Sequence, residues 1–375
     1  MSDTQPQSRA RVAEMTSFER VAQTLARRPV DQSPVVVSPW TSTIARWVAE
    51  GHITAETDVH AFFGQDLYWA GHINCIANLD MEPIVLEETE ETRLVQDGNG
   101  AILRRHKLHE STPEHVDFLV RDRDGWEAHI KPFLLEVDRR RISFDDYRTV
   151  KRRCADGQRF FCWGGLAPFE QMHPVCGHEY MLMGMALDPE WVQDMVMTYV
   201  EMTIRHAETL FAEEGVPDGM YFFEDMGFKQ RPFMSPAMYE EIMLPGHQRL
   251  FDFAHAHGCK VLMHSCGFIE PLLPGVIRAG LDCLQGMEVK AGMDLPTLFR
   301  DYGTHLSFFG GVDARVLISN DRAQIDAELE SKVRPVLQGG GGYILHSDHS
   351  EPPEVDFATV QYFVDRGRAM SRGEA

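Results

Sequence analysis

The chain has 375 residues, of which 43% are hydrophobic and 25% charged, and its formal net charge at pH 7 is −21. This composition is typical of a soluble globular protein with one large core or two smaller ones. Such a negative charge repels phosphate backbones and anionic lipids, which argues against a nucleic-acid or membrane partner. No stretch has the length and apolarity of a membrane-spanning helix, and residues 1–11 lack the apolar block of a signal peptide.

Seven cysteines are scattered along the chain without a CxxC pair: Cys75, Cys154, Cys162, Cys176, Cys259, Cys266 and Cys283. An odd number with irregular spacing argues against a disulfide framework. We therefore expect a reducing, cytoplasmic environment.

The N-terminal third predicts a flexible start, a helix, a strand and a β-rich segment. Residues 1–16 are expected to be flexible, and residues 17–25 have helical spacing after a serine cap. Residues 34–40 have the apolar run of a buried strand. Residues 84–134 are interpreted as a β-rich insertion rather than a separate domain. Within it, strand-like runs at 84–95 and 101–106 flank a strong hairpin turn, and a further strand is expected at 116–120.

After this segment, strand-like runs alternate with helical patterns. The strands are expected at 159–165, 219–224, 260–264, 281–288, 305–311 and 342–346. The clearest helical patterns lie at 188–213, 235–257 and 321–338. This alternation is typical of βα units with a parallel sheet.

With residues 34–40 the strand count is seven, and an eighth strand between residues 60 and 75 would complete a (β/α)8 barrel. No glycine-rich phosphate loop follows an early strand, which argues against an open nucleotide-binding sheet. The run Gly339–Gly342 precedes a strand and is therefore interpreted as a helix exit. We predict one barrel domain over residues 17–368, followed by a flexible end at 369–375.

Functional groups of such barrels lie at the C-terminal ends of the strands. The predicted strand ends carry the following side chains: Trp40, Trp163, Glu224, Asp225, His264, Cys266, Glu288, Asp313, His346 and His349. Solvated strand ends are the simpler explanation, but the clustering favours a functional rim. Of this set, Trp40, Trp163 and Asp313 are predicted to contact a cofactor.

His264 and Cys266 are one residue apart at the end of an apolar strand. On an extended backbone both side chains point to the same side. Imidazole and thiolate are good zinc ligands. Cys283 lies at the start of its strand, about 16 Å below the rim at roughly 3.3 Å per residue, and is rejected as a ligand.

His349 is the preferred third ligand, with Glu288 or Glu224 as substitutes. Three protein ligands would leave an open position, as in catalytic zinc sites. In the metal-free alternative, His346 and His349 are proton donors and Cys266 is a packed thiol.

Glu224 and Asp225 are adjacent, so on a regular strand only one of them faces the barrel mouth. Asp225 is preferred because it is nearer the loop, although it could instead cap the following segment. Asp225 or Glu288 is predicted to position the substrate or to transfer a proton, with Glu224 and His346 as further catalytic candidates.

Several motifs resemble the uroporphyrinogen decarboxylase superfamily. They are Glu19-Arg20-Val21, residues 28–34, Asp188-Pro189-Glu190, Met234-Ser235-Pro236, residues 264–267, residues 310–313 and residues 342–345. The resemblance runs from about residue 17 to 368 and implies a (β/α)8 barrel with its site at the strand C-termini.

The superfamily contains true decarboxylases and corrinoid-linked methyltransferases. In the decarboxylases an arginine-rich motif follows the first strand. Here the corresponding residues, Pro39–Thr43, include no arginine, and the first arginine after them is Arg46. In the methyltransferases a His-x-Cys and a late cysteine together bind zinc. His264 and Cys266 match this motif, while His349 stands at the late position, near which the decarboxylases also have a histidine.

The resemblance therefore implies zinc-assisted methyl transfer between a small methylated substrate and a corrinoid (cobalamin), thiol or folate. The corrinoid would be bound directly or carried by a separate protein, and a Met-rich neighbourhood could accept its ring. One alternative is a metal-free decarboxylase acting on a small carboxylic acid or a tetrapyrrole through Asp225 and His349. Another is a non-catalytic corrinoid or tetrapyrrole binder. The resemblance also suggests a homodimer.

Overall fold

The computed structural model describes residues 13–71, 73–107 and 113–374, which form two compact units. Unit 1 comprises Met1–Tyr68, Cys154–Phe160 and Asp294–Ala375, and unit 2 comprises Trp69–Arg153 and Phe161–Met293. Residues 1–12 of the predicted flexible start lie outside the described residues. At the other end of the chain, the last helix continues to Ser371. The prediction of a single domain stays a prediction.

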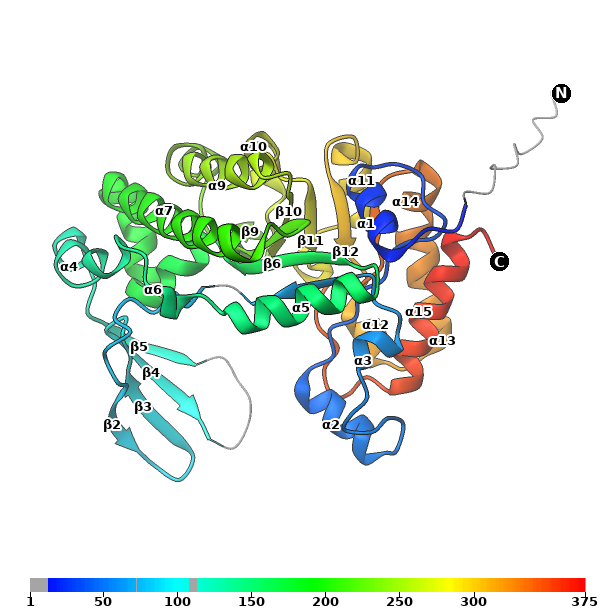
Figure 1. Cartoon of the computed structure of the whole chain (residues 1–375), viewed down its shortest axis with the longest axis horizontal. Coiled ribbons are helices and arrows are strands. Elements are labelled where there is room, and N and C mark those ends of the chain that lie inside the picture. Colours follow the sequence, from blue (N-terminus) through cyan, green and yellow to red (C-terminus); the bar gives the residue numbers. More distant parts are fainter. Residues whose placement is uncertain (1–12, 72, 108–112, 375) are drawn as a thin grey trace. The chain divides into compact units, whose positions relative to one another are not determined.

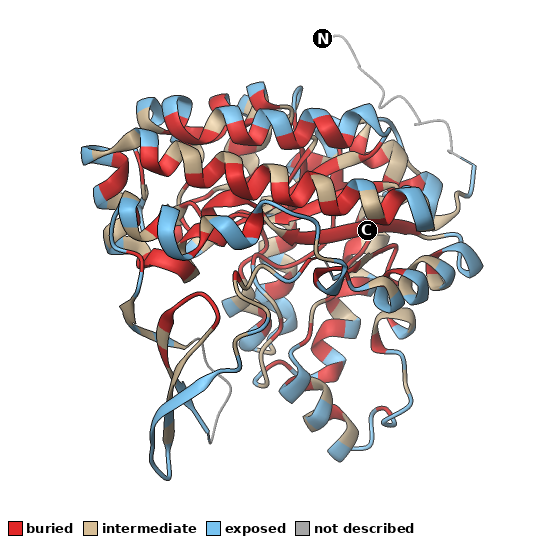
Figure 2. Cartoon of the chain, turned by 60° about the vertical axis from the view of Figure 1, so that its left-hand side comes forward, coloured by how far each residue is buried: buried red, intermediate tan, exposed pale blue. Residues whose placement is uncertain are grey.

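The core of unit 2 is a set of parallel strands. Adjacent strands pair in the order β6 (Phe160–Leu166), β7 (Gly219–Phe223), β10 (Lys260–Ser265) and β11 (Cys283–Gly286). Nearly all of their residues are buried, as Figure 2 shows in red. Apolar runs buried on both faces are typical of parallel sheets covered by helices.

Four helices of unit 2 follow these strands along the chain: α6 (Pro168–Leu187), α7 (Pro189–Glu214), α9 (Leu244–Ala256) and α10 (Leu273–Ala279). Trp163 of β6 packs against Phe211 of α7, and Phe222 of β7 packs against Phe251 of α9. These contacts show that one face of the parallel strands is covered by α7 and α9. His264 lies on the other face, because it is in register with Phe223 rather than with Phe222.

Unit 2 also contains an antiparallel sheet, drawn in cyan in Figure 1. Its strands pair in the order β2 (Ile84–Glu88), β3 (Thr92–Gln96), β4 (Ala101–His106) and β5 (Glu114–Phe118). The expected strand at 84–95 is thus two strands joined by a turn, and the strand expected at 116–120 begins and ends two residues earlier. That this sheet is an insertion into the barrel pattern stays an interpretation.

Unit 1 contains the parallel pair β12 (Ser307–Gly310) and β13 (Tyr343–Ile344). The backbone at residues 34–36 bonds to Leu345 on one side and to Asp66 on the other. Only the bridge at Val35 is regular there, so the strand predicted at 34–40 is wrong. Pro34 and Pro39 provide no N–H for a ladder, which explains the interruption.

The strand expected between residues 60 and 75 is β1 (Leu67–Ala70), which crosses the boundary between the units. The helices of unit 1 are α1 (Ser17–Leu25), α2 (Thr41–Ala49), α3 (Val59–Phe62), α11 (Leu295–Tyr302), α12 (Ala314–Ile318), α13 (Arg322–Glu328), α14 (Arg334–Gly339) and α15 (Phe357–Ser371). Further elements are α4 (Arg123–His129), α5 (Phe144–Asp156), β8 (Gly227–Phe228), β9 (Arg231–Pro232) and α8 (Pro236–Met238).

The chain therefore has an α/β fold in which parallel strands alternate with helices. The parallel strands, together with the bridge at Val35, provide the number of positions that a (β/α)8 barrel needs. A closed barrel remains our interpretation of this pattern. Within the described ranges, no helix is long and apolar enough to cross a membrane.

Candidate functional site

A cluster of three potential metal ligands lies at the C-terminal ends of β7 and β10 in unit 2. The imidazole of His264, the thiol of Cys266 and the carboxylate of Asp225 each place a ligand atom within 4.8 Å of the other two. His264 Nε2 is 3.1 Å from Cys266 Sγ and 3.3 Å from Asp225 Oδ1. The sequence predicts that Asp225 positions the substrate or transfers a proton, whereas the structure brings its carboxylate to the predicted metal ligands.

Hydrogen bonds from neighbouring strands hold this cluster in place. The backbone N–H of Cys266 donates to Asp225 Oδ1 at 2.7 Å, and Nδ1 of His264 contacts Oε1 of Gln285 on β11. The same Oε1 accepts a hydrogen bond from the hydroxyl of Tyr221 at 2.9 Å. Because Gln285 Oε1 is an acceptor, Nδ1 of His264 carries a proton. Its other nitrogen, Nε2, therefore faces Cys266 and Asp225, which is the arrangement that metal-binding histidines use.

Two glycines permit the close packing around these ligands. A Cβ on Gly286 would lie 3.2 Å from His264 Nδ1, so only glycine leaves the imidazole unrestricted space. Gly267, with φ of +75°, packs its backbone directly against Gly227, where a side chain would collide. The Cys266 loop is therefore fixed by backbone contact.

The electrostatics of the cluster favour a charged pair of His264 and Asp225. Burial lowers the pKa of His264, but hydrogen bonds to Asp225 and Cys266 outweigh it and raise that pKa well above its ordinary value. Burial likewise raises the pKa of Asp225, but His264 outweighs it and holds that pKa below its ordinary value. A proton on His264 therefore occupies the position that a metal cation would take.

Glu224, predicted as a catalytic group and a substitute ligand, is not part of this cluster. Its carboxylate is fully buried and lies 2.6 Å from Nε2 of His247 on α9. It also accepts backbone hydrogen bonds from Phe169 and Glu170 at the start of α6, at 3.0 and 3.1 Å. Burial raises its pKa. The prediction for Glu224 is wrong, because its side chain anchors helices instead of facing the cluster.

Glu288 and Trp163 complete the predicted residues of unit 2. Glu288 Oε2 accepts the backbone N–H of Gly267 at 2.8 Å, so it holds the loop that carries Cys266. Trp163 is buried against Phe211, on the face of β6 opposite to His264. The predicted contact of Trp163 with a cofactor is therefore wrong, because strand alternation turns this side chain toward α7.

The two predicted histidines of unit 1 have different environments. His346 is buried, and its Nε2 lies 3.0 Å from the hydroxyl of Ser38. His349 is 44% exposed, and its Nδ1 is 3.4 Å from Asp348. Their roles as proton donor and metal ligand stay predictions.

Asp313 and Trp40, predicted to contact a cofactor, also lie in unit 1. Asp313 caps α12 and forms an ion pair with Arg315 at 2.6 Å, so its carboxylate already has partners. Trp40 precedes α2 and is 47% exposed. Cofactor binding by either residue stays a prediction.

Gln285 and a group of stacked histidines are not among the residues predicted from the sequence. A polar residue inside an apolar strand, as at Gln285, is a signal that could have identified it. His178 stacks on His173 at a ring distance of 4.6 Å, and His115 lies 5.9 Å from His173. Burial, followed by the other two imidazoles, lowers the pKa of His178 to about 4, while the Asp225 carboxylate acts in the opposite direction. His178 is therefore a neutral aromatic side chain within electrostatic reach of the cluster.

Comparison with known proteins identifies the family. A model of the uroporphyrinogen decarboxylase (URO-D) family matches residues 147–370, which is more than half of the chain. The chain belongs to this family. The matched region includes all three residues of the candidate metal cluster, and the predicted superfamily is confirmed.

Among solved structures, a methyltransferase from Methanosarcina mazei is similar to this URO-D family member. The two share 15% sequence identity with a TM-score of 0.63, over 96% of this chain and 99% of that one. At this identity the similarity shows the fold alone. Comparison with curated proteins gave no match.

Proposed function

We propose that this URO-D family member is a zinc-assisted methyltransferase. It would move a methyl group between a small methylated substrate and a corrinoid, thiol or folate acceptor. The observation that carries this proposal is the grouping of His264, Cys266 and Asp225 within 4.8 Å of one another. The similarity to a solved methyltransferase supports the reaction class.

The donor atoms of the cluster suit zinc. One nitrogen, one sulfur and one oxygen give the mixed set that zinc accepts, and three protein ligands leave a fourth position for a substrate. When bound, the metal would supply a Lewis acid that lowers the pKa of a bound thiol or water. Gln285 would fix the imidazole of His264, and Glu288 would hold the loop that carries Cys266. His349 remains the alternative third ligand.

The proposed role of a corrinoid is based on the family resemblance. As a partner or co-substrate it would carry the methyl group, either bound by this chain or presented by a separate protein. A non-catalytic corrinoid or tetrapyrrole binder is the related alternative. Titration with cobalamin and with porphyrin, followed by visible absorbance, separates the two: spectral change without turnover of any methyl donor favours the binder.

A decarboxylase is the second candidate function, and the ion pair between His264 and Asp225 favours it. An imidazole whose pKa is raised by a neighbouring carboxylate is a proton donor at neutral pH. In a decarboxylase, such a donor would protonate the carbon that loses carbon dioxide. This reaction would use the same residues without metal.

Metal analysis distinguishes the two functions. We expect about one zinc per chain in the purified wild type and in Cys283→Ala, a control cysteine of the neighbouring strand, but little in Cys266→Ala. Loss of zinc in Asp225→Asn with retention in His349→Ala would identify Asp225 as the third ligand, and the reverse would identify His349. Equal metal in all variants, with full activity after chelation, would refute the zinc proposal.

A further inference from the structure

A cavity of about 400 Å³ lies within unit 1, and none of its lining residues belongs to the candidate metal cluster. It is next to the start of β13, whereas His346 and His349 follow the end of that strand. Its lining includes Thr24, Arg28, Val30, Leu337, Tyr343 and Ser371. This volume is in the range of small-molecule binding sites.

Most of the lining is apolar. Val30 and Leu337 contribute aliphatic side chains, and Tyr343 contributes its ring. The hydroxyl of Tyr343 already donates to the carbonyl of Gly310 at 3.0 Å, so the ring is what this residue offers to a ligand. An apolar lining of this kind favours a ligand with a hydrocarbon or aromatic body.

One charged group at this cavity has unused bonding capacity. Arg28 is exposed, and no carboxylate of the described residues lies within 4.0 Å of its guanidinium. A carboxylate in the cavity could accept two parallel hydrogen bonds from this guanidinium.

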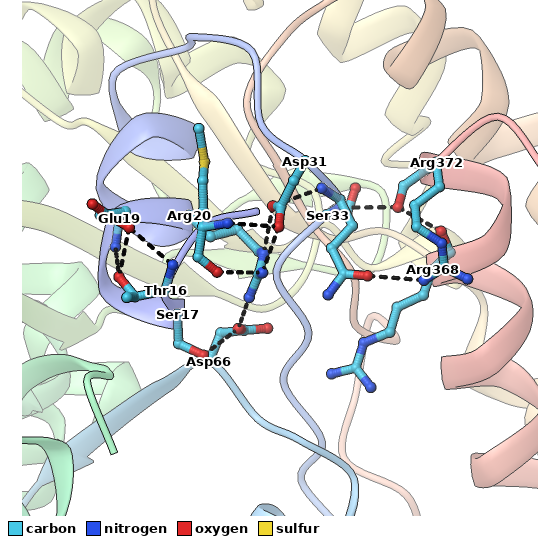
Figure 3. A network of polar contacts seen from close by, with 12 residues as sticks. Thr16, Ser17, Glu19, Arg20, Asp31, Ser33, Asp66, Arg368 and Arg372 are labelled. Atoms are coloured by element: carbon cyan, nitrogen blue, oxygen red, sulfur yellow. Dashed lines mark hydrogen bonds and ion pairs between the residues drawn. The ribbon is translucent and has the colours of Figure 1, made fainter. Parts of the chain in front are cut away.

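The wall that carries Arg28 is held by a buried ion-pair network, shown in Figure 3. Arg20 bonds to Asp31 and to Asp66, each at 2.7 Å. The backbone N–H of Ser33 donates to Ser371 Oγ at 3.0 Å, which ties the same segment to α15. Asp31 is thus occupied by Arg20, and the cavity is formed before any ligand arrives.

The glycine run beside the cavity has a packing explanation of its own. A side chain on Gly341 would collide with the ring of Phe299, and one on Gly342 would collide with the carbonyl of Thr24. These glycines are therefore required for close packing, and they give no reason to expect a phosphate loop. The charge recognition in this cavity comes from Arg28.

We propose that this cavity binds a small amphiphilic carboxylate. The carboxylate accepts from the guanidinium of Arg28, and the apolar body packs against Val30, Leu337 and Tyr343. The site is independent of the proposed methyltransferase activity, because it shares no residue with the metal cluster.

Isothermal titration of the full chain with sodium octanoate tests this proposal, with 1-octanol and inorganic phosphate as comparison probes. We expect octanoate to bind at least fivefold more tightly than either probe. Arg28→Gln should weaken octanoate binding at least fivefold. Arg27→Gln is the matched control, because Arg27 is adjacent in sequence but does not line the cavity, and it should leave binding unchanged.

Undetectable octanoate binding to the wild type would overturn the proposal. Equal weakening by Arg27→Gln and Arg28→Gln, or phosphate binding as tight as that of octanoate, would also overturn it.

Discussion

The adjacent residues Glu224 and Asp225 should respond to mutation in opposite ways. Glu224→Ala leaves three donors without their acceptor, namely the backbone N–H groups of Phe169 and Glu170 and the imidazole of the buried His247. Each unsatisfied donor costs about 1–3 kcal/mol, and removing one partner of a buried pair costs about 3–5 kcal/mol. We expect the free energy of unfolding to fall by about 3–5 kcal/mol.

Asp225→Asn should cost much less stability. The Asp225 side chain is 38% exposed, and asparagine keeps an oxygen that can accept the N–H of Cys266. Partly exposed ion pairs contribute about 1 kcal/mol or less. This variant should instead lose zinc, because the negatively charged ligand is gone.

Urea unfolding followed by circular dichroism, with a check that refolding restores the signal, measures both stabilities under the same conditions. Zinc content is measured on the same samples. Wild-type stability of Glu224→Ala would refute the anchoring role of Glu224. A loss of stability in Asp225→Asn as large as that in Glu224→Ala would refute the separation of roles.

Three further predictions concern pH and backbone conformation. Because the pKa of His264 is well above its usual value, zinc must displace a proton below that pKa, and any proton on the Cys266 thiol as well. A chelator competition at pH 6, 7 and 8 should therefore show zinc affinity rising with pH, and a flat profile would contradict this. Burial raises the pKa of Glu351 to about 7. Its protonated form therefore contributes its full stabilisation of the folded state below about pH 4.5, and this contribution is lost as the pH rises through 7. Glu351→Gln should flatten the pH profile of the melting temperature. Gly177→Ala should lower the urea midpoint, since Gly177 has φ of +69° and a side chain would collide with the ring of Phe118; an unchanged midpoint would refute this.

The periodic elements could be predicted because their patterns are local. The helix expected at 188–213 is α7 at Pro189–Glu214, since a long apolar stripe with Asp188 as its cap defines both period and start. The prediction of a single strand at 84–95, where the structure has two, failed for a local reason too. The turn at Thr89–Glu91 contains no glycine, proline or asparagine, so nothing in the sequence marked it.

The side-chain roles depended on contacts that the sequence does not contain. Alternation predicted that Glu224 and Asp225 face opposite sides, but only the packing of His247 and the start of α6 decides which is buried. The prediction that Trp163 contacts a cofactor failed for a related reason. Its face became evident only from the pairing of β6 with β7, which puts it beside Met220 rather than Tyr221.

A proton and a metal cation are alternatives in the cluster of unit 2, because a protonated His264 supplies positive charge beside the Asp225 carboxylate. A bare group of Asp225, Cys266 and a neutral imidazole would have no positive charge to offset the carboxylate, whereas the protonated imidazole pairs with it at 3.3 Å. Metal and proton therefore compete for one position between the same side chains. It follows that loading with zinc should release a proton with little rearrangement of the loop, since Glu288 and Gly227 hold that loop through contacts that do not involve His264.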